Sequence, residues 1–424
     1  VLLERVTAEP LYELKMLYSH HAWLLAELVT ALRGRVGEMR EPPLGLDEPP
    51  VAALQLALDE IAAAPDAAHL CAAAYEVLIP ALVAACERLH ADAHPLADAP
   101  SRHLLRHAGL DLADLRAAGQ QAARALAAVA APDQAWLALV AQALDAAHGL
   151  DGTAADAPPC PEAHFSRTPR PFDPVPRRDA RFADPFNMGV NAEAFLYDTT
   201  LPAEPKLLML AYKRLREIDV PEMMATIIVE TTGKPWAYRR DMTRQLWDEA
   251  RHAMMGEVLF AALGVDWPAR VPINFTWSLG LNTQLTPLDR HAVLYFIEQG
   301  LMPRHGKRYE WEVAQAAGSP LAANFQDYDW ADEVLHARIG KQWYVSAMPS
   351  HTEALRHGDR CWSAVLIDWS AWQREGRTAH QNWWPALYAD TCARLGWTYD
   401  ARVASFSTSY ADQRADLRAV SQSG

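Results

Sequence analysis

The sequence has few cysteines, and none of them lies close to another. Its 424 residues include five cysteines and no C-x-x-C pair; they are Cys71, Cys86, Cys160, Cys361 and Cys392. An odd number at wide spacing argues against a disulfide framework, and the missing pairs exclude the common zinc motifs. This cysteine usage favours the reducing cytoplasm as the location of the protein.

Basic residues and long apolar runs are also scarce. The chain has 53 acidic against 39 basic residues and a formal net charge of -14. This balance argues against nucleic acid and against an anionic membrane surface as the main partner. No uninterrupted apolar run reaches the length of a membrane span, and Glu4, Arg5 and Glu9 lie in the first turns, so we expect neither a span nor a signal peptide. The length of 424 residues predicts two or more domains, and because half of the residues are hydrophobic we expect a globular protein with sizeable cores.

Proline is concentrated in one segment, which divides the chain into four parts. Residues 1–148 carry apolar residues at helical spacing and predict an N-terminal helical lobe. The proline-rich residues 149–200 predict an extended strap held by aromatic anchors, or alternatively a disordered linker. The anchors would be Phe165, Phe172, Phe182 and Phe186. Residues 201–347 predict a helical bundle that carries the chemistry, and residues 348–424 a helical, tryptophan-rich extension.

Two copies of Glu-x-x-His are the main candidates for a site. Glu249 and His252 form the first copy, Glu333 and His336 the second, and each copy has an aspartate directly before its glutamate. A spacing of three places both side chains on one face of a helix. One such pair often marks a solvated helix face, whereas two in matched contexts are what a di-metal carboxylate bundle requires.

Two further carboxylates are expected from the helices that precede these motifs. We predict helices over residues 205–232, 235–263, 286–317 and 320–343, joined as hairpin, crossover and hairpin. Glu298 lies 35 residues before Glu333, a separation that returns an antiparallel hairpin to the same depth. Glu217 lies 16 residues before Gly233 and Glu249 lies 15 after Lys234, so Glu217 matches the depth better than its alternative, Glu222. Rotation of the helix at Pro221 would reverse this choice.

The N-terminal lobe also contains histidines and glutamates. His20, Glu76, Glu87 and His90 could suggest a second metal constellation, but Glu87-x-x-His90 has no second copy in the lobe. Polar residues of helical lobes mostly cap, pair or face solvent. We therefore expect this lobe to be a metal-free bundle.

The residues around both motifs resemble those of ferritin-like di-iron carboxylate proteins. The resemblance runs through residues 216–222, 236–240, 248–252, 298–301 and 332–343, and covers roughly residues 200–345. Within that superfamily the chain is similar to an uncharacterised bacterial ferritin-like family related to the tRNA-modifying di-iron hydroxylases. The resemblance implies an all-α fold with a ferritin-like four-helix bundle that carries a di-metal site. The N-terminal lobe resembles a degenerate second bundle of the same kind.

The candidate ligands are four carboxylates and two imidazoles, which suit two iron ions and are compatible with manganese. They are Glu217 (alternatively Glu222), Glu249, His252, Glu298, Glu333 and His336. We expect Asp248, Asp332 or Asp219 to hold the imidazoles by hydrogen bonds.

The resemblance implies an oxygenase or oxidase that uses O2 as co-substrate, an external electron donor and a small or medium organic substrate. The alternative is a non-catalytic or protective metal protein that handles iron, removes peroxide or holds a structural metal. A tRNA substrate follows by analogy alone and is disfavoured by the acidic charge; a homodimer is compatible with the sequence. We expect a substrate pocket between the metal helices, with the strap near its mouth. Its walls would include Met223, Met224, Met254, Met255, Phe296 and Trp343.

Overall fold

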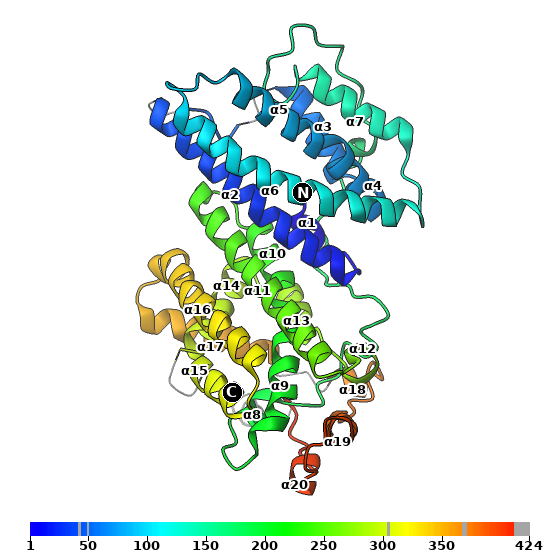
Figure 1. The fold of residues 1–424 in the computed structure, drawn as a ribbon, viewed down its shortest axis with the longest axis vertical. Coiled ribbons are helices and arrows are strands. Elements are labelled where there is room, and N and C mark those ends of the chain that lie inside the picture. Colours follow the sequence, from blue (N-terminus) through cyan, green and yellow to red (C-terminus); the bar gives the residue numbers. More distant parts are fainter. Residues whose placement is uncertain (41–43, 49–50, 303–305, 367–370, 411–424) are drawn as a thin grey trace. The chain divides into compact units, whose positions relative to one another are not determined.

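The protein is all-helical, as the sequence predicts, and no strand occurs among the residues that the structure describes. The computed structural model describes residues 1–410 except 41–43, 49–50, 303–305 and 367–370 (Figure 1). The chain forms two compact units. Unit 1 comprises Val1–Arg5 and His20–Asp173, and unit 2 comprises Val6–Ser19 and Pro174–Gly424. The boundary between residues 173 and 174 falls inside the segment predicted to be a strap.

Unit 1 is built from helices that pack as pairs. Its main elements are α1 (Leu3–Val6, up to Arg5), α2 (Tyr12–Met39, from His20 on), α3 (Ala52–Ala62), α4 (Ala67–Ala72), a π-helical turn (Ala73–Leu78), α5 (Ile79–Asp92), α6 (Ala99–Ala127) and α7 (Gln134–Ala146). Helix α6 packs against α4 and α5, and α3 packs against α7. Gly119 of α6 is required for this packing, since a Cβ atom there would lie 2.1 Å from the Tyr75 ring. Asp66 and Asp133 cap α4 and α7 by accepting hydrogen bonds from backbone N–H groups.

The stretch Ala67–Asp92 is helical throughout. Its 26 residues are long and apolar enough to cross a membrane by length and composition, although no uninterrupted apolar run reaches that length. The uninterrupted run is shortened by residues such as Glu76, whereas the helix as a whole keeps a high mean hydropathy. Leu70 to Tyr75 are buried within unit 1, as expected for a core helix that passes the same test.

Unit 2 contains the helices with both Glu-x-x-His motifs. Its longer elements are α9 (Ala203–Arg216), α10 (Asp219–Glu230), α11 (Trp236–Ala262), α13 (Thr276–Gln284), α14 (Pro287–Gly300), α15 (Lys307–Ala316), α16 (Pro320–Trp343), α17 (His351–Leu366) and α19 (Trp384–Leu395). The short helices are α8 (Ala192–Leu196), α12 (Trp267–Arg270), α18 (Ala371–Arg374) and α20 (Ala401–Ala404). Helix α11 packs against α9, α10 and α16, and α16 packs in turn against α14 and α15. The two motif helices are therefore direct neighbours.

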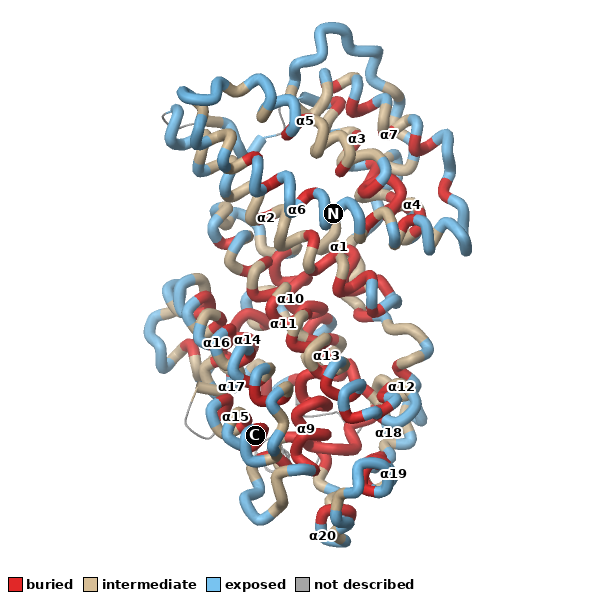
Figure 2. The backbone as a smooth tube through the Cα atoms, viewed as in Figure 1, coloured by how far each residue is buried: buried red, intermediate tan, exposed pale blue. Residues whose placement is uncertain are grey.

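Helix α9 is buried on all its faces, and buried residues follow α9, α10 and α11 in Figure 2. Its buried cations need partners, because an unpaired charge in a core is costly. Lys213 pairs with Glu310 of α15, and Arg214 pairs with Asp329 of α16. The two ion pairs tie α9 to the second helical hairpin.

Two of the predicted long helices are broken. The predicted helix 205–232 is α9 followed by α10, because Pro221 has no N–H for the Glu217 carbonyl and its ring crowds that position. The predicted helix 286–317 is α14, which ends at Gly300, followed by α15 from Lys307. Residues 303–305 of this prediction lie outside the described residues. Glu217 thus sits at the C-cap of α9, and Glu298 lies in the last turn of α14.

The predicted strap contains more regular structure than expected. Helix α8 and a 3-10 turn at Phe165–Arg167 interrupt it. Phe165 packs on Trp136 in unit 1, with ring centroids 5.3 Å apart. Phe182 and Phe186 pack on Trp267 and Phe275 in unit 2, with centroids 5.4 and 4.9 Å apart. Phe172 is half-buried. These ring contacts agree with the predicted anchoring role.

Candidate metal centre

The two Glu-x-x-His motifs face each other across α11 and α16. The rings of His252 and His336 are 5.9 Å apart between centroids, and both side chains are fully buried. Glu249 and Glu333 are buried beside them. Carboxylates and imidazoles are buried in a protein core only when they are paired or bind a metal.

The first group of donor atoms surrounds His336. One donor atom from each of Glu249, Glu298, Glu333 and His336 lies within 4.8 Å of the others. The Nδ1 atom of His336 is 3.0 Å from Glu249 Oε1, 3.7 Å from Glu333 Oε2 and 3.8 Å from Glu298 Oε1. Three carboxylates and one imidazole thus converge on one point.

The second group surrounds His252 and contains Glu217 and Asp329. The Nδ1 atom of His252 is 3.4 Å from Glu217 Oε2, 3.4 Å from Asp329 Oδ1 and 3.5 Å from Glu249 Oε2. Glu249 therefore turns one oxygen toward each group and is placed to bridge two ions. The two groups contain all six residues that the sequence favoured, together with Asp329.

The imidazoles are held by aspartates in a crossed arrangement. His252 Nε2 is 3.2 Å from Asp332, which belongs to the motif of α16, and His336 Nε2 is 3.3 Å from Asp248, which belongs to the motif of α11. Arg251 pairs with both aspartates. These contacts turn each Nδ1 toward the donor groups, as carboxylates beside metal-binding histidines do. Asp219, the third candidate for this role, instead pairs with Arg178.

Several polar atoms in these groups have no hydrogen-bond partner. Among the described residues, His252 Nδ1, His336 Nδ1, Glu217 Oε2 and Glu333 Oε2 are buried without one. Each unsatisfied buried polar group costs about 1–3 kcal/mol. The four atoms converge on the centres of the two groups, where divalent ions would satisfy them. The donor set therefore fits two metal ions.

The close packing of charged side chains in the two groups shifts their pKa values. Burial opposes charge on Glu249, yet the two neighbouring imidazoles lower its pKa to about 2. Burial and the neighbouring Glu333 carboxylate raise the pKa of Glu298 well above its ordinary value. Burial lowers the pKa of both histidines, but the surrounding carboxylates outweigh it and raise both pKa values well above 6.5. Bound metal ions would displace these protons.

Lys307 and Arg214 place two cations beside the second group. Lys307 Nζ is 2.8 and 3.0 Å from the two oxygens of Asp329, and 2.7 Å from Glu333 Oε1. Arg214 pairs with Asp329 and lies 3.0 Å from Glu217 Oε1. Neither these two cations nor Asp329 was predicted from the sequence. A signal existed for Asp329, which precedes Glu333 by one helical turn on the same face; none marks Lys307.

Glu222, the alternative to Glu217, lies outside both groups. It is fully buried, where Lys15 Nζ (2.8 Å) and Arg178 Nη2 (3.0 Å) pair with it and Ser278 donates a hydrogen bond of 2.6 Å. Its carboxylate is thus fully engaged in an ion-pair network. Glu310, a buried glutamate of α15, is likewise held by Lys213 and accepts a hydrogen bond from Tyr197.

A cavity of about 120 Å³ adjoins both groups. Glu217 and Glu298 form part of its wall, and most of the rest is apolar, including Val220, Met223 and Ile297. Of the six predicted wall residues only Met223 lines it; Met224, Met254, Met255, Phe296 and Trp343 do not. Val220 and Met223 share one face of α10, which turns Met224 elsewhere. No described residue of segment 149–185 lines the cavity, but Arg178 of this segment pairs with Asp219 in the cavity wall, so the strap near its mouth stays a prediction.

Comparisons with protein-family models, with curated proteins and with solved structures gave no match.

Proposed function

We propose that this protein is a non-haem di-iron oxidoreductase whose ions lie in a ferritin-like arrangement of four helical layers. The layers would be α9 with α10, α11, α14 with α15, and α16. The observation that carries the proposal is the convergence of unpartnered donor atoms in two largely buried groups, with one oxygen of Glu249 facing each.

Each group would hold one ion. Glu298, Glu333 and His336 would bind the first, Glu217, His252 and Asp329 the second, and Glu249 would bridge them. Oxygen donors with one imidazole per ion suit Fe2+ or Mn2+. Two ferrous ions would supply electrons for the reduction of O2. An external electron donor would then return the ions to the ferrous state.

The protein residues would select and orient the substrate. The cavity is smaller than the 300–1,000 Å³ usual for drug-sized ligands, so it fits a small organic molecule. Its apolar wall, formed in part by Met223, Leu294 and Ile297, would exclude water, and Glu217 and Glu298 would place the reacting part of the molecule beside the ions. Lys213 and Arg216 also line the cavity, together with Glu193 and Asp219, so charges of both signs would meet a polar group of the substrate at that end.

Lys307 supports a second candidate function. Its ammonium neutralises Asp329 and Glu333, which reduces the attraction of the second group for an ion. A protein that holds one ion, for a structural or protective role, would show this feature. The alternative differs from the proposal in the number of metal ions per chain and in the reaction with O2.

Metal analysis and oxygen uptake separate the two functions. Protein from iron-supplemented cells should contain two iron ions per chain, and the ferrous protein should consume O2 in an oxygen electrode. The E249A variant should lose iron and oxygen uptake, while E222Q, a change of a buried glutamate outside both groups, should retain both. One iron per chain and no oxygen uptake by the ferrous protein would establish the non-catalytic alternative.

A further inference from the structure

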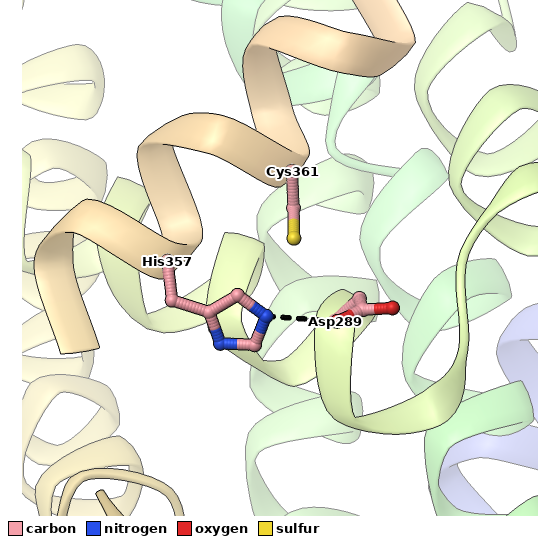
Figure 3. A group of neighbouring side chains, drawn as sticks. All are labelled: Asp289, His357 and Cys361. Atoms are coloured by element: carbon pink, nitrogen blue, oxygen red, sulfur yellow. Dashed lines mark hydrogen bonds and ion pairs between the residues drawn. The ribbon is translucent and has the colours of Figure 1, made fainter. Parts of the chain in front are cut away.

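A second cluster of metal-binding side chains lies where α17 packs against the first turn of α14. Asp289, His357 and Cys361 each place one donor atom within 4.8 Å of the others. Figure 3 shows His357 and Cys361 projecting from α17 toward Asp289 on the neighbouring helix. All three side chains are half-buried. None of them belongs to the two groups around His252 and His336.

The local structure brings these three residues together. His357 and Cys361 are four residues apart and therefore share one face of α17. Between them, Gly358 permits a close approach of the two helices, because a Cβ atom there would lie 2.5 Å from the Ala292 carbonyl oxygen of α14. The cluster is thus built into the packing of α17 on α14.

The carboxylate of Asp289 is fixed from one side only. The Thr286 hydroxyl donates to its Oδ2 atom over 2.6 Å, within the capping box that begins α14. The Oδ1 atom faces His357 Nε2 at 2.8 Å. One carboxylate oxygen is therefore held in place, and the other points into the cluster.

Tyr344 orients the His357 ring. The Tyr344 hydroxyl lies 3.0 Å from the Ala354 carbonyl oxygen and 3.0 Å from His357 Nδ1. This contact engages Nδ1 and leaves Nε2 facing the Asp289 oxygen, so one ion could bind both atoms.

We propose that Asp289, His357 and Cys361 bind one Zn2+ ion, with a solvent molecule as the fourth ligand. A thiolate, an imidazole and a carboxylate are typical zinc ligands, and the thiolate disfavours Mg2+ and Ca2+. Tetrahedral zinc with ligand distances of 2.0–2.2 Å separates N and O atoms by about 3.3 Å. The Nε2 to Oδ1 distance of 2.8 Å needs to open by only about half an ångström. The half-exposed position leaves room for the solvent ligand.

Binding would change the protonation of the cluster without any redox step. Burial, together with Asp289, raises the pKa of the Cys361 thiol to about 11, so the thiol is protonated in the absence of an ion. Zinc would replace the S–H bond by a Zn–S bond and release that proton to solvent. The ion would join α17 to α14, the helix that also carries Glu298.

Cobalt is the direct probe, because a Co2+ ion bound to thiolate shows a charge-transfer absorption that oxygen and nitrogen ligands alone do not give. Wild-type protein stripped by a chelator should develop this band as Co2+ is titrated beyond the two equivalents that the di-metal groups could take up, and Zn2+ should abolish it. C361S and H357Q should each lose the band. C160S, which removes an exposed cysteine, and E333A, which alters the di-metal candidate, should keep it.

The outcomes are independent of the proposed di-iron function. A band lost in C361S or H357Q but retained in E333A supports the zinc site even if the other site binds nothing. The proposal is overturned if folded wild-type protein gives no thiolate band with Co2+, or if C361S retains the band. Far-UV circular dichroism identifies a variant that fails to fold, and H357Q then takes the place of C361S.

Discussion

Replacing Lys307 with methionine tests whether its ammonium group and the second ion compete for the same carboxylates. Lys307 Nζ is buried, 2.8 Å from Asp329 Oδ1. An ion bound to Asp329 at about 2.1 Å would lie about 4 to 5 Å from Nζ. Two unit charges 4 Å apart at an effective dielectric of about 20 interact by about 4 kcal/mol, and a divalent ion doubles this repulsion.

The same substitution should lower the stability of the metal-free protein. Without an ion, the Lys307 ammonium is the counter-ion of Asp329 and Glu333, and removal of one partner of a buried ion pair costs about 3–5 kcal/mol. Rearrangement of these carboxylates offsets part of the gain in ion binding. We therefore expect K307M to bind the second ion at least about tenfold more tightly, a gain of about 1.4 kcal/mol, and to lose about 3 kcal/mol of metal-free stability.

Two measurements check this expectation. Titration with Mn2+ against a competing chelator gives the affinity for the second equivalent, and urea unfolding of chelator-treated protein gives the metal-free stability. K206M is the matched control, because Lys206 is a buried lysine that binds the Asp198 carbonyl and Tyr309 rather than either donor group. Unchanged or weaker binding of the second ion by K307M would refute the competition.

Three further predictions concern the site and unit 1. E249A should lose both ions, as measured by metal analysis, with little change in helix content by circular dichroism, because the helices pack through their apolar faces. D332N should weaken metal binding by about 10- to 100-fold in the same chelator titration, because His252 loses the carboxylate that orients it. Burial lowers the pKa of His21 from 6.5 to about 3, so the unfolded chain takes up the proton first; the associated stability is complete above pH 6.5 and falls by about 1.4 kcal/mol per pH unit toward pH 3. H21Q should flatten this part of the stability profile in urea unfolding between pH 3 and 7, and an unchanged slope would contradict the assignment.

The sequence predicted the site residues that depend on helix periodicity and on hairpin length. A spacing of three from glutamate to histidine fixes a common helix face, and equal distances from a turn fix a common depth. These two rules place Glu217, Glu249, Glu298 and the two histidines where the structure brings them together. The all-α fold follows from the same periodicity.

Breaks in the helices could not be predicted in this way. Asp329 shares a helix face with Glu333 and follows from the same periodicity, whereas Lys307 enters because α15 starts after a break. The zinc candidate brings together residues 289, 357 and 361, which no short motif connects. Such contacts depend on how closely helices approach, and here a single glycine, Gly358, sets that approach.

The crossed pairing of histidines and aspartates fixes the axial register of α11 against α16. His252 bonds to Asp332 and His336 bonds to Asp248, so each helix both donates to and accepts from the other. A displacement of one helix along the other by a single residue, about 1.5 Å, would break both contacts together and swing both imidazoles away from the centre. The donor groups and the axial alignment of the two helices are therefore coupled, and neither half of the site can shift alone.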